Sequence, residues 1–107
     1  MPRVTLVRYE TKPERTDENE ALSRAVFAEL RATHPPGVAY ALFRNGDAFL
    51  HLFVNFADDS SDAVTELATF KRFQQDAAQR WSVPADPMRV SADMVEAYGF
   101  DLAPAPV

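Results

Sequence analysis

The residues with the clearest chemical potential lie in one apolar segment, Phe49 to Phe56, whose composition is that of a β-strand. Side chains alternate between the two faces of a strand, so Phe49, His51, Phe53 and Asn55 share one face. The opposite face carries aliphatic side chains and the ring of Phe56. Large rings beside one imidazole and one amide are typical of a pocket that holds a mostly apolar molecule by a few polar contacts.

His51 is the candidate catalytic residue, because an imidazole has a pKa of about 6.5 and exchanges protons near neutral pH. Such a residue can help to deprotonate a phenol or enol, provided that its surroundings exclude bulk water. A histidine among phenylalanines would provide both. The structural alternative is a core or interface histidine that is paired with a carbonyl group or with Asn55. Asn55 itself would either orient a substrate carbonyl group or pair with backbone.

Other aromatic side chains are candidates for the wall of the same pocket. Tyr40 and Tyr98 each could offer a phenol hydroxyl to a ligand oxygen, although tyrosines at strand ends also cap cores. Phe70, Phe73 and Trp81 recur at helical spacing and are expected in the core, where all three are also candidates for the pocket roof.

The sequence offers few residues for other kinds of site. It contains no cysteine and two histidines, His34 and His51, so no recognisable spacing of zinc or iron ligands occurs. The three glycines, at positions 37, 46 and 99, form no phosphate loop or dinucleotide fingerprint, and no Gly-x-Ser-x-Gly elbow is present. We therefore expect neither a metal site nor a cofactor.

Length and composition are those of one ordinary globular domain: 107 residues, 47% hydrophobic and 25% charged. The formal charge of −5 disfavours non-specific binding to nucleic acid or anionic lipid. No segment approaches the roughly 20 apolar residues of a membrane span. Charged residues break the N-terminal apolar run too early for a signal peptide. We expect a cytoplasmic protein with no nucleic-acid or membrane partner.

Hydrophobic periodicity and turn residues predict six elements. Strands are expected over 3–10, 38–44, 48–56 and 88–98, and helices over 18–33 and 69–80. Asp17 and Glu20 form a capping-box pattern at the start of the first helix. The pair Asn45-Gly46 tolerates positive φ at both centres of a hairpin turn. A polar loop is expected over 57–62, a rigid connector over 83–87, and a bulge in the irregular last strand.

The order strand, helix, strand, strand, helix, strand predicts an α+β protein with the ferredoxin-like βαββαβ fold and a four-stranded antiparallel sheet. We expect one domain over residues 1–100 and a flexible tail over 101–107. Two helices cover only one face of such a sheet, yet the central hairpin is apolar on both faces. A second copy is therefore predicted to pack its sheet against the uncovered face, which makes the protein a homodimer.

This order of elements resembles the dimeric α+β barrel superfamily and, within it, the antibiotic biosynthesis monooxygenase-like domains. The segments that carry the resemblance are NEAL (19–22), VFAEL (26–30), GVAY (37–40), TEL (65–67) and FKRFQ (70–74). The resemblance implies small dimers with a pocket between sheet and helices in each subunit. It also implies that some members oxidise phenolic polyketide intermediates with molecular oxygen and no cofactor. Related haem-degrading barrels ligate iron through a histidine on the second helix, where this sequence has none, so haem is not expected.

The resemblance implies a cofactor-independent monooxygenase acting on a small aromatic or polyketide-like substrate in a pocket of each subunit, and His51 among aromatic residues is compatible with it. One alternative is a non-catalytic module or accessory protein that binds a hydrophobic metabolite in the same cavity. Another is a structural dimer whose side chains fill both faces of the sheet. The alternation of side chains does not decide whether His51 faces the helices or the partner sheet.

Overall fold

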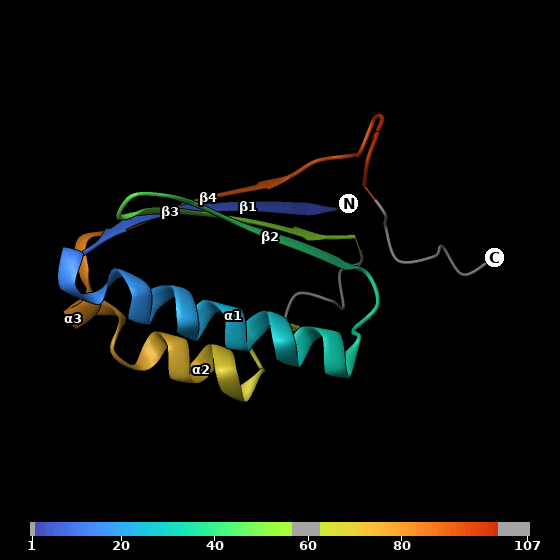
Figure 1. The fold of residues 1–107 in the computed structure, drawn as a ribbon. Helices are drawn as coiled ribbons and strands as arrows, with labels where there is room; N and C mark the ends of the chain where they lie inside the picture. Colours follow the sequence, from blue (N-terminus) through green and yellow to red (C-terminus); the bar gives the residue numbers. More distant parts are fainter. Residues whose placement is uncertain (1, 57–62, 101–107) are drawn as a thin grey trace.

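The computed structural model describes residues 2–56 and 63–100, and in it helices cover one face of a four-stranded sheet (Figure 1). The elements are β1 (Arg3–Thr11), the 3₁₀ turn η1 (Pro13–Arg15), α1 (Thr16–Thr33), β2 (Val38–Asn45), β3 (Ala48–Asn55), α2 (Ala68–Gln75), α3 (Ala77–Arg80) and β4 (Trp81–Ser91). The expected loop over 57–62 and the expected tail over 101–107 lie outside the described residues.

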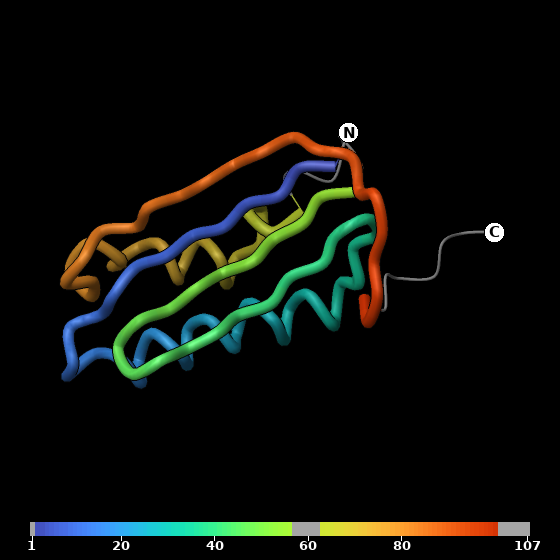
Figure 2. The backbone as a smooth tube through the Cα atoms, turned by 90° about the horizontal axis from the view of Figure 1, so that it is seen from above, coloured from blue at the N-terminus to red at the C-terminus, as the bar shows by residue number. Residues whose placement is uncertain are grey.

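The strands lie in the order β2-β3-β1-β4, and each neighbouring pair is antiparallel (Figure 2). This arrangement confirms the predicted ferredoxin-like α+β fold. It makes β1 and β3 the central strands, so side chains from β1, β2 and β3 that point to the same face can meet over the middle of the sheet.

The predicted capping box of the first helix is wrong. α1 begins at Thr16, after η1, and its N-cap residue Arg15 makes no side-chain capping bond. Asp17 lies inside the first helical turn, where its carboxylate pairs with Arg44 of β2 at 3.2 Å. At the other end, His34 adopts the left-handed conformation and its N–H bonds to the Leu30 carbonyl oxygen, so the helix stops before the prolines.

The second predicted helix is divided into two. α2 runs from Ala68 to Gln75, Asp76 leaves the helical conformation with φ −125°, and α3 follows for one turn. The Asp76 carboxylate accepts a hydrogen bond from Arg15, which ties this break to the start of α1. Trp81 is therefore not on a helix, as its spacing had suggested, but is the first residue of β4.

The last strand begins seven residues earlier than predicted, at Trp81 rather than position 88, and ends at Ser91. It includes the predicted connector over 83–87, although this segment holds two prolines. Because β4 is an edge strand, its outward-facing backbone groups have no partner strand. A proline there, which lacks an N–H group, therefore removes no hydrogen bond of the sheet. The register shifts lie opposite Arg8 to Thr11, near the start of β4, and not within residues 88–98, where the bulge was expected.

The predicted hairpin between β2 and β3 is present, but its turn is centred one residue later. Asn45 still pairs with Ala48, so Gly46 and Asp47 form the two-residue loop. Gly46 has φ +61°, and no positive φ occurs at Asn45 or Asp47. Glycine alone in the left-handed region at the first central position is typical of a type II′ turn rather than a type I′ turn.

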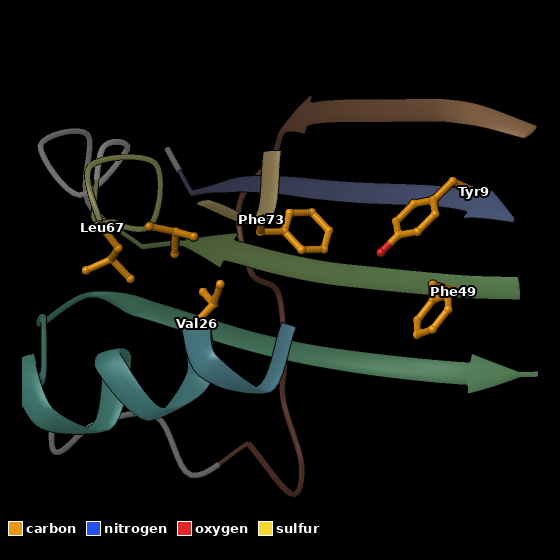
Figure 3. Close-up of a cluster of buried hydrophobic side chains, with 6 residues drawn as sticks. Tyr9, Val26, Phe49, Leu67 and Phe73 are labelled. Atoms are coloured by element: carbon orange, nitrogen blue, oxygen red, sulfur yellow. The ribbon is translucent and has the colours of Figure 1, made fainter. Parts of the chain in front are cut away.

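The helix-facing side of the sheet holds the core. Its buried cluster joins β1 and β3 to α1, α2 and the segment before α2 (Figure 3); the members are Tyr9, Val26, Phe49, Val64, Leu67 and Phe73. On the opposite face, Phe43, Leu50, Met88 and Val90 are 37% to 55% exposed. The predicted strand with two apolar faces is thus covered by helices on one face only (Figure 1).

No helix in the described part of the chain is both long enough and apolar enough to cross a membrane.

Candidate functional site

Three strands place a histidine between two tyrosines on the helix-facing side of the sheet. His51 of β3 lies opposite Val7 of β1 and Leu42 of β2, so Tyr9 and Tyr40 are its diagonal neighbours. Diagonal neighbours lie within reach of long side chains. The Tyr9 hydroxyl lies 2.7 Å from His51 Nε2, and the Tyr40 hydroxyl lies 2.6 Å from His51 Nδ1. Both ring nitrogens of the histidine are therefore engaged by phenols.

A second layer of polar groups supports Tyr9 from the helical side. Asn19 of α1 donates its side-chain N–H to the Tyr9 oxygen over 2.9 Å. The Asn19 Oδ1 atom accepts bonds from Arg80 Nε at 2.7 Å and from Trp81 Nε1 at 3.1 Å. Arg80, at the end of α3, also donates to the Phe73 carbonyl oxygen at 2.7 Å. A continuous hydrogen-bonded chain thus runs from Arg80 to Tyr40, and we refer to it as the Arg80–Tyr40 chain.

Burial controls the protonation of the groups in this chain. Removal from water lowers the pKa of His51 to about 4, because the charged imidazolium loses hydration. Burial raises the pKa of Tyr9 to about 12, although the Asn19 bond and the Arg80 charge act in the opposite direction. Burial also raises the pKa of Tyr40 above its ordinary value. At neutral pH a neutral imidazole therefore lies between two neutral phenols.

A pocket of about 360 Å³ lies between the helix-facing side of the sheet and α2. This volume is at the small end of the range for pockets that bind small molecules. Most of the wall is aromatic or aliphatic, and the lining residues are Arg3, Thr5, Val7, Tyr9, Tyr40, His51, Phe53, Asn55, Val64, Thr65, Phe70, Phe73, Gln74, Trp81, Ala85, Pro87 and Arg89. The described lining residues include two arginines and no carboxylate. The pocket is therefore apolar with a positive bias, in a chain whose formal charge is −5.

The structure brings most of the sequence-predicted site residues together. His51, Asn55, Phe53, Tyr40, Phe73 and Trp81 all line this pocket. Phe49 does not line it, because its ring is buried against Tyr9 at 5.5 Å and borders a different hollow, of about 270 Å³, beside α1 and β2. Tyr98 is fully exposed and lies outside β4, so it presents no phenol to the pocket. The side of the strand that carries His51 is thus the side that faces the helices.

Three residues of the Arg80–Tyr40 chain were not predicted from the sequence: Tyr9, Asn19 and Arg80. A signal existed for Asn19, because Asn19 and Ser23 precede Val26 at helical spacing and place polar groups on a face that must be buried. Tyr9 shares its strand face with Val7, which parity would have shown. Arg80 gives no such signal, since a basic residue at a helix end is ordinarily solvated.

Within the described residues, no group of three or more histidine, aspartate or glutamate side chains gathers in a way that could hold a metal ion.

Solved structures with the same fold are numerous. A candidate antibiotic biosynthesis monooxygenase from Nitrosomonas europaea superposes with a TM-score of 0.71 at 15% identity, covering 85% of this chain and 89% of that one. Another from Caulobacter crescentus gives a TM-score of 0.74 at 15% identity, with 87% and 91% covered. An antibiotic biosynthesis monooxygenase gives 0.71 at 20% identity, with 88% and 100% covered. No family model and no curated protein matches the sequence.

The fold and the pocket define this protein as a ferredoxin-like α+β domain with a ring-lined cavity under its helices. More narrowly, its fold is that of the antibiotic biosynthesis monooxygenase-like domains, which confirms at the level of the fold the resemblance predicted from the sequence. A shared fold does not fix a reaction, so the function must be argued from the pocket.

Proposed function

We propose that this protein is a cofactor-independent monooxygenase that oxidises a small aromatic or polyketide-like molecule in the pocket of each subunit. The observation that supports this most is the position of the Tyr40–His51–Tyr9 group in the wall of an aromatic pocket. Rings hold a planar apolar substrate, while the hydroxyl groups and imidazole stabilise an ionised oxygen. Structural neighbours that are named as antibiotic biosynthesis monooxygenases agree with this proposal.

The proposed reaction balances without a further reductant. An activated CH₂ group next to a phenol ring loses both hydrogens and becomes a carbonyl group, which is a four-electron oxidation of that carbon. One atom of O₂ enters the new carbonyl group, and the other leaves as water with the two hydrogens. The ionised, electron-rich substrate supplies the electrons, and the protein stabilises the anion in a site shielded from water.

Oxygen uptake tests this proposal directly. A screen of phenols, hydroquinones and anthrones under air is expected to find substrates that the wild-type protein oxidises. His51→Phe is expected to lower that rate about 10²-fold, because it removes the imidazole and its hydrogen bond to the Tyr40 hydroxyl. The control is His34→Asn, which changes the exposed histidine at a position where asparagine tolerates the left-handed conformation. No oxygen uptake on any of these classes, or equal rates in His51→Phe and wild type, would contradict the proposal.

A second candidate function, a non-catalytic binding module, is favoured by one observation: both ring nitrogens of His51 are already engaged by tyrosines. A histidine held in this way can serve to shape a pocket. Under this function, an aromatic ligand would raise the melting temperature of the protein without any oxygen uptake.

The exposed apolar face of the sheet supports a homodimer. Phe43 and Leu50 lie directly opposite each other on β2 and β3, and Met88 and Val90 continue the patch on β4. Exposure of these apolar side chains to water is unfavourable for a lone subunit, and two copies that pack sheet against sheet would bury them.

Leu50→Glu is expected to weaken the dimer at least about 100-fold, because each interface would bury two unpaired carboxylates. Leu50 is partly exposed in the single subunit, so the fold itself should persist. The control is Ala28→Glu, which adds the same charge at an exposed position of α1. Sedimentation equilibrium measures both. A wild-type protein that is monomeric at micromolar concentration, or a Leu50→Glu variant that dimerises normally, would contradict the proposed dimer.

A further inference from the structure

We infer that the Tyr40 hydroxyl donates its proton into the pocket, so that the site selects ligands with an acceptor oxygen there: a phenolate, an enolate or a carbonyl group. This inference rests on the proposed function in one respect, because it takes the pocket beside Tyr40 to be the ligand site. It adds to that function a direction of hydrogen bonding, and hence a class of ligand. The direction follows from the donors at the far end of the Arg80–Tyr40 chain.

The orientation of the Asn19 amide is set by two groups that can only donate. Arg80 Nε and Trp81 Nε1 both carry a hydrogen and both point to the same atom of Asn19. That atom must be the oxygen, so the amide nitrogen faces Tyr9 and donates to the phenol oxygen over 2.9 Å. Rotating the amide by 180° would place its N–H₂ group against two other donors.

The direction of the remaining hydrogen bonds, from Tyr9 to Tyr40, follows from the same count of donors and acceptors. In the described part of the chain, the Tyr9 hydroxyl has close contacts with Asn19 at 2.9 Å and His51 at 2.7 Å. Ser23 also lies beside it, but the Ser23 hydroxyl donates its own proton to the Asn19 carbonyl oxygen. Because Asn19 donates to it, Tyr9 uses its own proton to donate to His51 Nε2. A neutral imidazole then carries its proton on Nδ1 and donates to the Tyr40 oxygen over 2.6 Å. Among the described members of the Arg80–Tyr40 chain, no acceptor remains for the Tyr40 proton, so this proton is directed to the pocket that Tyr40 lines.

The charges around the pocket favour the same ligands. Arg80 is fully buried, and its Nη1 atom has no hydrogen-bond partner in the described structure, so a positive charge lies behind the chain. Arg3 and Arg89 add two more cations to the lining, and no carboxylate opposes them among the described lining residues. Hydrogen bonds that point the same way also polarise one another in a low-dielectric interior. An anionic oxygen next to Tyr40 is therefore stabilised by both dipoles and charges.

The ionisation of bound 4-nitrophenol, a small chromophoric phenol, tests the direction. An apolar pocket without a directed donor would raise the pKa of a bound phenol, because burial disfavours the phenolate. The inferred arrangement predicts the opposite sign: the phenolate should bind about tenfold or more tightly than the phenol, as a hydrogen bond to a charged oxygen allows. Absorbance titrations from pH 5 to 9 measure this preference. No saturable binding, or a preference for neutral phenol, would overturn the inference.

Two variants test whether the preference for phenolate comes from the Tyr40 hydroxyl or from the positive charges around the pocket. Tyr40→Phe removes the donor and is expected to abolish the tenfold preference. Asn19→Asp is nearly isosteric and should reverse the chain, because a carboxylate at position 19 accepts from Tyr9 as well as from Arg80. Tyr9 would then accept from His51 Nε2, and Tyr40 would donate to Nδ1 and become an acceptor toward the pocket. This variant is expected to prefer neutral 4-nitrophenol.

The ¹⁵N shifts of the two histidines give an independent readout that needs no ligand. His51 is expected to carry its proton on Nδ1 in the wild type and on Nε2 in Asn19→Asp, while the exposed His34 is unchanged. An Nε2-protonated His51 in the wild type would overturn the inference. The two proposals can fail separately. A preference for phenolate without oxygen uptake would contradict the oxygenase but keep the directed donor at Tyr40. Oxygen uptake with a preference for neutral phenol would keep the oxygenase and contradict the directed donor.

Discussion

Replacing Tyr9 by alanine is expected to lower the free energy of unfolding by about 3–5 kcal/mol, as is usual for a fully buried ring. Tyr9 is 1% exposed, and its ring stacks on Trp81 at 4.1 Å and on Phe49 at 5.5 Å. Removing it opens a cavity among Phe49, Phe73 and Trp81, and these rings cannot close the cavity because three elements of the fold fix them. Urea denaturation at one fixed protein concentration measures the loss.

Tyr9→Phe separates the hydroxyl group from the ring. This variant keeps the stacking but leaves the Asn19 N–H and His51 Nε2 without their partner, so a loss of about 1–3 kcal/mol is expected. Tyr98→Ala is the matched control, because Tyr98 is fully exposed and its replacement should change stability by less than about 0.5 kcal/mol. If Tyr9→Phe were as unstable as Tyr9→Ala, the ring packing would not be the main contribution. If neither variant lost stability, Tyr9 would not be part of the core.

The fold was predictable because its strongest signals are local. The spacing of apolar residues identified both helical regions, and glycine and proline identified the turn at Gly46 and the end of α1. That Phe49, His51, Phe53 and Asn55 share one face of β3 was predictable, since alternation along a strand depends on neighbouring residues alone, but which face meets the helices was not. The errors also have physical causes: prolines suggested a connector where an edge strand tolerates them, and Asp76 divides a helix whose apolar spacing continues through it.

The candidate site was only half predictable, because its chain of hydrogen bonds joins residues far apart in sequence. The hairpin turn fixes how Tyr40 and His51 lie relative to each other, and both were candidates from the sequence. No turn connects β1 to β3, so nothing local places Tyr9 beside His51. Arg80 and Asn19 meet across 61 positions of the chain, and their contact depends on how the helices pack on the sheet. Polar residues of this kind are recognised only when their partners are known.

Acid is expected to lower the free energy of unfolding, because burial keeps His51 neutral in the folded protein. The pKa of His51 in the folded protein is about 4, below the value of about 6.5 in an unfolded chain, so the unfolded state binds more protons between these values. The contribution of the neutral histidine to stability is therefore complete above pH 6.5 and is lost as the pH falls toward 4. The full loss is about 3 kcal/mol, from the difference in pKa.

Denaturant unfolding at intervals from pH 4.5 to 7 measures this loss. Hydrogen bonds and ion pairs lower the pKa values of Glu18, Glu20 and Glu29, so their own acid dependence begins as the pH approaches the unfolded-chain value of about 4.3 and affects only the lower end of this range. His51→Asn is expected to be less stable at pH 7 but to show a nearly flat profile, whereas His34→Asn should follow the wild type, because His34 is exposed. Equal slopes in His51→Asn and wild type would show that His51 is not held neutral by burial. The Tyr40–His51–Tyr9 group would then lack the neutral imidazole on which its hydrogen-bond direction depends.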